Sequence, residues 1–427
     1  MSWNHVAALV VFAGAYLLIA TERVHRVAAA LGGAALMLAL GLTDGPAAFY
    51  SADTGVDWNV VFLLFGMMVI VGVIRRTGLF EALAIHAAKR ARGRPFPVLV
   101  LLVVITAVAS AMLDNVTTVL LVAPVTFLVC ERLALPVVPY LIAEVMASNI
   151  GGTATLIGDP PNIIIGSRAG LSFNDFLVNL APFSVVMTGV LIGLCWLLFR
   201  RSFVYDASLV AEVMALSERE AIRDWRLLWQ SLAVLGLVLL GFVLHPVLGY
   251  EPSVVALLGA GLLVLISTAT VEEALADVEW ETLVFFMGLF VMVGALVETG
   301  LIGDLSSWLG DVVGGNTEIA SVVLLLASML LSGVIDNIPY VATMAPVVAD
   351  LSRHQAGHGD VLWWALALGA DLGGNATAVG ASANVVVVGM AKRYGSPISF
   401  WRFTRYGAVV TLASAALAVP YLLLRYF

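Results

Sequence analysis

The chain has 427 residues, of which 61% are hydrophobic and 12% are charged, and its formal net charge is −8. A soluble globular domain carries about 25% charged residues, so this composition indicates a membrane protein whose apolar surface is covered by lipid. It excludes a basic surface for nucleic acid. The two separated cysteines, Cys130 and Cys195, exclude a disulfide framework and a cysteine-rich metal site.

A helix that spans a bilayer needs about 20 predominantly apolar residues. Several segments approach this length with no acidic or basic residue near their middle. The first of them lacks a basic leading region and a cleavage motif, so we expect a retained helix and not a signal peptide. In chain order the expected spans are residues 5–20, 27–41, 58–74, 176–199, 227–246, 253–270, 282–297 and 406–424.

Two further apolar segments are interrupted by an Asp-Asn pair. Residues 95–130 are apolar apart from the region of Asp114, and residues 317–348 repeat this design around Asp336. We expect each segment to form a re-entrant helical hairpin with its aspartate at the tip, inside the membrane. A tight turn between two full spans is the alternative, and it would place each aspartate at a surface.

Two other segments contain a glycine pair within a polar stretch. Residues 136–167 include Gly151-Gly152, and residues 361–390 include Gly373-Gly374. Lipid cannot hydrogen-bond to the backbone of a broken helix, so such breaks occur inside protein or against a water-filled cavity. We therefore predict one broken helix in each segment. Close helix packing, which small residues allow, is the alternative interpretation.

The two halves of the chain repeat one another with a constant offset of 222 residues, as in Asp114 and Asp336 (336 − 114 = 222). A register without gaps over this length indicates an internal duplication. Other pairs with this offset are Asp57-Trp58 and Glu279-Trp280, Asn115 and Asn337, Gly151-Gly152 and Gly373-Gly374, Thr155 and Thr377, and Asn162 and Asn384.

The basic residues predict the orientation of the two halves. The loop at residues 75–94 is rich in arginine and lysine, whereas its counterpart at residues 298–318 carries only acidic charges. Because basic loops remain in the cytoplasm, the two loops face opposite sides and the amino terminus lies outside. The expected fold is an all-α polytopic protein of the bacterial inner (plasma) membrane. It has two inverted repeats of five spanning helices each, residues 1–199 and 229–427, joined by a cytoplasmic linker, residues 200–228. We expect this linker to form a surface helix.

Polar side chains near the hairpin tips and helix breaks are the candidate ion-binding residues, because an ionisable group at membrane depth is costly and usually functional. Glu144 and Asp159 are further acids near the first break, and helix capping is the alternative role for both. The candidate residues are Asp114, Asn115, Thr117, Thr118, Asn149, Gly152, Thr153, Thr155, Asn162, Asp336, Asn337, Asp371, Gly374, Asn375, Thr377 and Asn384, with a candidate sodium site at Asp114, Asn115, Asp336 and Asn337.

No lysine, arginine or histidine lies within residues 95–130 or 361–390. This absence favours cation coupling, or a substrate that is neutral or weakly charged. The chain contains no phosphate-binding loop for ATP and no pattern of nucleophile and base, so we expect a protein that is not an enzyme. We expect no cofactor, and a proton or a sodium ion as the coupling ion.

These motifs resemble an ion-transporter superfamily that includes the arsenical-pump membrane subunit, the P protein and the citrate and divalent-anion symporters. The resemblance is carried by residues 114–118, 143–145, 149–162, 336–339 and 373–384, and it extends over about residues 57–403. It is closest to the branch of the P protein and the arsenical pump. In the dicarboxylate symporters both tips begin with serine, whereas both begin with aspartate here.

The resemblance implies an ion-coupled secondary active transporter of the elevator type that moves a small inorganic or organic ion. It also implies a homodimer, and an accessory ATPase if the protein works like the arsenical pump. The first expectation is efflux of an arsenite-like oxyacid with proton or sodium coupling. A sodium/proton antiporter and a di- or tricarboxylate (citrate-like) symporter are the alternatives, and a passive channel is a different class of protein.

Overall fold

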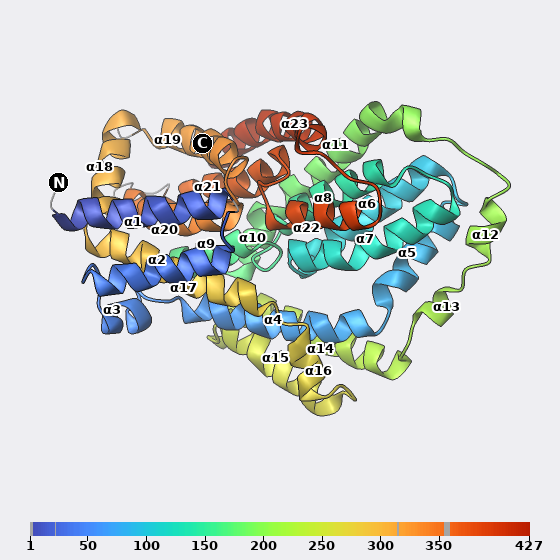
Figure 1. Ribbon diagram of the computed structural model, residues 1–427, viewed down its shortest axis with the longest axis horizontal. Helices are drawn as coiled ribbons and strands as arrows, with labels where there is room; N and C mark the ends of the chain where they lie inside the picture. The colour runs from blue at the N-terminus through green and yellow to red at the C-terminus, as the bar shows by residue number, and fades with distance from the viewer. Residues whose placement is uncertain (1–2, 22, 314–315, 354–358) are drawn as a thin grey trace.

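The computed structural model describes residues 3–21, 23–313, 316–353 and 359–427, and within these ranges the chain is helical and has no β-strand. Figure 1 shows the helices gathered in one elongated bundle. Among the described residues, seven helices are long and apolar enough to cross a membrane. They are α4 (Trp58–Arg76), α6 (Pro95–Met112), α7 (Asn115–Arg132), α11 (Ala181–Phe199), α14 (Trp225–Leu248), α17 (Trp280–Glu298) and α23 (Phe400–Tyr426).

Shorter helices complete the bundle. The span expected at residues 176–199 is divided, because α10 (Phe173–Asn179) ends just before Pro182, which suits the first turn of α11. The shorter apolar helices are α1 (Trp3–Ala20), α2 (Arg26–Ala39), α8 (Val137–Gly152), α15 (Pro252–Ile266) and α19 (Thr317–Ser332). The others are α3 (Gly45–Tyr50), α5 (Leu79–Arg90), α9 (Pro160–Ala169), α16 (Val271–Ala276), α18 (Leu301–Val313), α20 (Asn337–Arg353), α21 (Gly359–Gly373), the 3₁₀ turn η2 (Gly374–Ala376) and α22 (Ser382–Arg393).

Equivalent helices of the two halves make equivalent contacts. In the first half α6 and α7 pack on α8, and in the second half α19 and α20 pack on α21. Contacts also cross between the halves, because α7 packs on α22 and α20 packs on α9. In Figure 1, α22 accordingly lies beside α7 and α8, although it belongs to the other half of the sequence. The two tips and the two helix breaks therefore meet in the middle of the molecule.

Two glycines at equivalent positions of the two halves allow two further pairs of helices to approach closely. A Cβ atom on Gly66 of α4 would lie 2.7 Å from the Ala256 carbonyl carbon of α15, and one on Gly288 of α17 would lie 2.9 Å from that of Ala30 in α2. Helices packed in lipid use small residues in this way, because close approach of the backbones increases van der Waals contact. α4 also packs on α9, and α17 packs on α20, so these two pairs of helices lie next to the helices that follow the first break and the second tip.

The segment between the halves does not form one continuous helix. It contains η1 (Arg200–Ser202), α12 (Val210–Met214) and α13 (Glu218–Ala221), and α14 begins within the expected linker at Trp225. Figure 1 shows α12 and α13 at one edge of the bundle, where both pack on α5. Lys89 of α5 donates to the Leu216 carbonyl at 3.0 Å and to Glu218 Oε2 at 2.8 Å. The linker is therefore attached to the first half.

Replacing Lys89 with glutamine is expected to loosen residues 216–221. The hydrogen bond from Lys89 lowers the pKa of Glu218 below its ordinary value of 4.5, so the ion pair is present at neutral pH and is lost only as the pH falls through that lowered pKa. Surface pairs contribute about 0.2–1 kcal/mol, so amide hydrogen exchange in this segment should rise by up to about fivefold at pH 7. Arg132→Gln is the control. Arg132 also faces an acid of the linker, Glu212, but at 4.0 Å the two side chains are too far apart for a hydrogen bond. Equal exchange in Lys89→Gln and the unmodified protein would contradict this attachment.

Candidate functional site

Both glycine pairs coincide with the ends of helices. α8 ends at Gly152 and α9 begins at Pro160, while α21 ends at Gly373 and the chain becomes helical again at Ser382, after η2. Side chains do not fit at the first break, since a Cβ atom on Gly152 would lie 2.5 Å from the Gly158 carbonyl oxygen. The predicted interruption of the helices is therefore present in the structure.

Two asparagines satisfy carbonyl groups that the helix breaks leave without partners. Asn162 Nδ2 donates to the carbonyl oxygen of Thr155 at 3.0 Å and to those of Gly152 and Thr153 at 3.4 Å. Asn384 Nδ2 donates to the carbonyl oxygens of Gly374 at 2.7 Å and Thr377 at 2.8 Å. Buried carbonyl groups need such partners. The amide nitrogens of Asn162 and Asn384 thus stabilise the breaks, and their Oδ1 atoms face away from these carbonyls.

Two threonines tie the breaks to the neighbouring tips. Thr155 Oγ1 donates to the Ala111 carbonyl oxygen at 2.6 Å, and Thr377 Oγ1 donates to the equivalent Gly333 carbonyl oxygen at 2.7 Å. In both bonds the threonine hydroxyl group donates its proton to a backbone carbonyl group. Thr155 and Thr377, which the sequence places among the candidate ligands, therefore have structural partners in each half.

The two tip aspartates, Asp114 and Asp336, are half-buried. Asp114 Oδ1 accepts from the Thr117 amide at 2.7 Å and caps α7, whereas Asp336 Oδ1 accepts from the Ile338 amide at 3.0 Å. Thr117 lies in the first turn of α7, where Thr118 Oγ1 is buried without a hydrogen-bond partner. Each tip aspartate thus stabilises the start of a helix through its Oδ1 atom, and Asp336 Oδ2 also accepts a hydrogen bond from Ser382 Oγ at 2.6 Å.

Asp159 is the residue at which the two tips meet. Asn115 Nδ2 of the first tip donates to Asp159 Oδ2 at 2.9 Å, and Asn337 Nδ2 of the second tip lies 3.4 Å from both carboxyl oxygens. The side chain is 0% exposed. It makes no capping bond to α9, so the capping role considered for it is wrong. From the sequence alone Asp159 could be either a cation site or a helix cap, because nothing local connects it to Asn115 or Asn337.

Glu144 has a different environment. It lies inside α8, is buried, and hydrogen-bonds with Thr126, so it does not cap a helix either. The capping role considered for Glu144 is therefore also wrong. Its described hydrogen bond does not connect it to the tips or to the breaks.

A second set of amides joins the two broken helices. Asn149 Nδ2 donates to Asn375 Oδ1 at 3.0 Å and to Asn384 Oδ1 at 3.2 Å, and Asn149 Oδ1 accepts from Asn115 Nδ2 at 3.2 Å. Thr153 Oγ1 donates to the Asn149 carbonyl oxygen at 2.9 Å. The amides and Asp159 form one connected, buried network to which both halves contribute.

Carboxyl groups dominate the electrostatics of this network. Asp114, Asp336 and Asp371 lie near enough to Asp159 for their carboxyl groups to interact with it through charge. Asp371 is 0% exposed, and neither of its oxygens has a hydrogen-bond partner. Buried charges that are not paired are strongly destabilising. The cluster, defined here as Asp114, Asp159, Asp336 and Asp371 with the amides around them, therefore requires added positive charge when these acids ionise.

One basic residue reaches the cluster from a distant part of the sequence. Arg26, at the start of α2, donates from Nη1 to Ser382 Oγ at 2.9 Å and from Nη2 to Thr282 Oγ1 at 3.4 Å. Ser382 in turn donates to Asp336 Oδ2 at 2.6 Å, and Thr282 donates to Glu279 Oε2 at 3.0 Å. Arg26 lies outside the interrupted segments, so no local sequence pattern indicates that it reaches the site.

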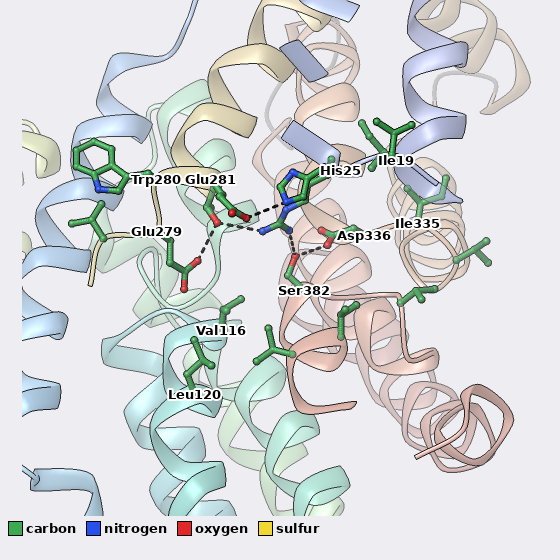
Figure 2. Close-up of a pocket in the computed structure, with 18 residues that line it drawn as sticks. Ile19, His25, Val116, Leu120, Glu279, Trp280, Glu281, Ile335, Asp336 and Ser382 are labelled. Atoms are coloured by element: carbon green, nitrogen blue, oxygen red, sulfur yellow. Dashed lines mark hydrogen bonds and ion pairs between the residues drawn. The ribbon is translucent and has the colours of Figure 1, made fainter. Parts of the chain in front are cut away.

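An open cavity of about 850 Å³ lies beside Arg26. Figure 2 shows Glu279 and Glu281 on one side and Asp336 and Ser382 on the other, with hydrogen bonds that cross between them. A much smaller space shares Arg26, Glu279 and Ser382 with this cavity and is also lined by Asp114 and Pro160. The cavity thus leads from the surface toward both tips.

An all-helical bundle with apolar helices, two broken helices and a buried acidic cluster between them defines a membrane transporter. Residues 16–369 match the model of the citrate transporter family, and the chain belongs to this family within the ion transporter superfamily. Relatives and a solved structure agree with this assignment.

The chain is 57% identical over 424 residues to an uncharacterized transporter of Mycobacterium tuberculosis, covering 99% of both chains. It is 35% identical over 497 residues to the P protein of Homo sapiens, covering 97% of this chain and 59% of that protein. The crystal structure of the YdaH transporter of Alcanivorax borkumensis has a similar fold, with a TM-score of 0.57, 16% identity and 97% of each chain covered.

Proposed function

We propose that this protein is a secondary active transporter driven by a monovalent cation, and that sodium/proton exchange is its basic activity. The observation that carries the proposal is Asp159, a buried carboxyl group held by one asparagine from each tip. A cation bound there contacts both halves of the molecule at once. Movement of either tip then changes the affinity of the site, which is the requirement for coupling transport to a gradient.

The chemistry of the cluster favours a cation over an anion. Four carboxyl groups interact there, and the amides that surround them supply further oxygen atoms. Carboxylate and carbonyl oxygens are the ligands that hard cations prefer. A citrate-like anion would meet like charge at the same place. A proton or a sodium ion neutralises the cluster and is the simplest species for this site.

Inverted repeats would give this site access to the two sides of the membrane in turn. The constant offset of 222 residues (336 − 114) and the opposite loop charges support two halves of opposite orientation. Transporters with inverted repeats place their ion sites at discontinuous helices near the bilayer midplane. In this proposal, the segments that carry the tips and breaks move together, elevator-fashion, relative to the remaining helices.

Arg26 supports a second candidate function, in which a small oxyacid or carboxylate moves together with the cation. The guanidinium group lines the large cavity and donates to Ser382, next to Asp336. Guanidinium groups bind carboxylates and oxyanions through paired hydrogen bonds. An arsenite-like oxyacid or a citrate-like substrate would bind in this cavity beside Arg26, and neither Asp159 nor Asp371 is among the residues that line it.

Purified protein in proteoliposomes separates these functions. With an imposed pH gradient, external sodium should dissipate the gradient in vesicles that contain the protein and not in empty vesicles. Labelled arsenite and citrate are tested in the same vesicles under imposed proton and sodium gradients. Uptake of either solute that depends on a cation gradient supports the second function. Fluxes that respond to neither gradient would contradict cation coupling and indicate a passive pore.

A further inference from the structure

A cavity lined by arginines lies between α11 and α23, the last long helices of the two halves. Figure 1 shows these helices side by side at one edge of the bundle. They run antiparallel, because the ring of Phe199 is 4.8 Å from that of Tyr406, and the ring of Phe183 is 5.4 Å from that of Tyr421. The end of α11 therefore meets the start of α23, and a cavity of about 420 Å³ opens there. This arginine cavity is lined by Leu197, Leu198, Arg200, Arg201, Arg405, Tyr406 and Val409.

Three guanidinium groups share the arginine cavity without an acid. Arg200 and Arg201 follow α11 in η1, and Arg405 lies in the second turn of α23. All three residues are exposed, and none forms an ion pair with the acidic side chains that the structure describes. Arg200 lies over the ring of Trp196, 6.0 Å from its centroid. Like charges that line one cavity repel each other, so the cavity favours an anion that contacts all three.

The helix ends account for only part of this charge. The carboxyl end of a helix favours basic side chains, whereas the amino end favours acidic ones. Arg200 and Arg201 suit the end of α11 in this respect. The first turn of α23 contains no acid, and its first two turns carry Arg402 and Arg405. Arg405 and the amino end of α23 therefore both present positive charge to the cavity, which indicates a role in binding an anion.

The arginine cavity adjoins apolar surface that faces lipid. Only 28% of the most apolar stretch of α23 and 33% of that of α11 are buried, the lowest shares among the seven candidate spans of the described residues. Leu197 at the cavity is 57% exposed, and Leu412, which follows Val409 by about one turn of α23, is 70% exposed. A ligand with a charged head and an apolar tail matches both surfaces.

We propose that the arginine cavity binds the headgroup of an anionic phospholipid. The phosphate is held among Arg200, Arg201 and Arg405, and the acyl chains lie along Leu197 and Val409. Guanidinium groups bind phosphate oxygens through paired hydrogen bonds, and basic pockets between spanning helices suit such headgroups. Because α11 packs on α8 and α23 packs on η2, the lipid would join the two halves at this membrane surface. This site is separate from the proposed cation site and does not depend on it.

Competition between two lipids tests the proposal. The purified full chain is equilibrated in detergent micelles with equal amounts of phosphatidylglycerol and phosphatidylcholine that have the same acyl chains. Native mass spectrometry then counts the molecules of each lipid that stay bound. Each arginine near a membrane surface favours an anionic lipid by about fivefold, so bound phosphatidylglycerol should exceed bound phosphatidylcholine by about tenfold or more. Equal binding of the two lipids would overturn the proposal.

Glutamine in place of the cavity arginines tests where the lipid binds. The triple variant Arg200→Gln, Arg201→Gln and Arg405→Gln should reduce the preference for phosphatidylglycerol to about twofold or less. If the triple variant does not fold, Arg405→Gln is used alone. It removes a positive charge from an unfavourable place in a helix, so it should fold, and the preference should fall about fivefold. An unchanged preference in the variant that folds would overturn the proposal.

The matched control removes the same charge elsewhere. Arg90, Arg92 and Arg219 are exposed, form no ion pair with the described acidic side chains and do not line the arginine cavity. The triple variant Arg90→Gln, Arg92→Gln and Arg219→Gln should keep the preference for phosphatidylglycerol. An equal loss in this control would mean that net charge and not the cavity selects the lipid, which would overturn the proposal.

Two further results distinguish a lipid from other occupants. Glycerol 3-phosphate at the same concentration should not displace phosphatidylglycerol, because it lacks the acyl chains. Complete displacement would assign the cavity to a soluble phosphate and overturn the proposal. A cavity variant that keeps its lipid but changes from a dimer to a monomer in the same spectra would assign the cavity to a second copy of the chain, and would also overturn it.

Discussion

Asp159→Asn is expected to lower sodium-dependent dissipation of a pH gradient by about 10- to 150-fold. The side chain keeps its shape and can still accept a hydrogen bond from Asn115 Nδ2, so the protein should fold. It loses the charge that holds both tips and binds the cation. Hydrogen bonds to charged groups contribute about 1.5–3 kcal/mol, which corresponds to this range of rates. The measurement is the initial rate in proteoliposomes at equal protein content.

Glu144→Gln is the matched control for this prediction. It removes a buried carboxyl group of the same half, on α8, whose hydrogen bond with Thr126 does not reach the tips. Its transport rate should stay within about threefold of the unmodified protein. Similar losses in both variants would mean that Asp159 acts through general stability and not as the ion-binding residue.

Gly151→Ala is expected to destabilise the fold more than alanine does at a glycine whose added Cβ atom would meet no other atom within 4 Å. A Cβ atom on Gly151 would lie 2.2 Å from the carbonyl oxygen of Ala107, at the contact between α8 and α6. The backbone cannot yield without separating these helices. Overpacking of this kind costs about 1–3 kcal/mol or more. Melting of the purified protein should therefore occur at a clearly lower temperature, with a lower yield of folded protein.

Gly189→Ala provides the comparison, because nothing lies within 4 Å of its added Cβ atom in α11. Alanine favours a helix over glycine by up to about 1 kcal/mol, so this variant should be as stable as the unmodified protein or slightly more so. Equal stability of the two alanine variants would show that α6 and α8 do not approach as closely as described.

Local sequence features were sufficient to predict the helix breaks. Gly151-Gly152 and Gly373-Gly374 lie in apolar segments where glycine and neighbouring polar residues disfavour a continuous helix, and both helices do end there. The role of Asp159 was not predictable in the same way. Its partners, Asn115 and Asn337, come from both halves of the chain, and only the tertiary fold brings them to one carboxyl group.

The position of Arg26 shows a second limit of sequence reasoning. It reaches Ser382 across 356 positions of the sequence, so no local pattern connects the two residues.

The fold of the linker, residues 200–228, was also not predictable from the sequence. A single surface helix was consistent with its composition, yet it folds as short helices that follow the surface of α5, because side chains such as Lys89 bind particular carbonyl and carboxyl groups.

The most direct test of cation-coupled transport is uphill movement of labelled sodium. Proteoliposomes with an acidic interior are placed in a more alkaline medium with equal sodium on both sides. If protons leave through the protein in exchange for sodium, the interior sodium concentration should rise above that outside, and a protonophore should abolish the rise. Asp159→Asn should show little accumulation. Sodium that never exceeds its equilibrium concentration, with or without the pH gradient, would contradict sodium/proton exchange by this protein.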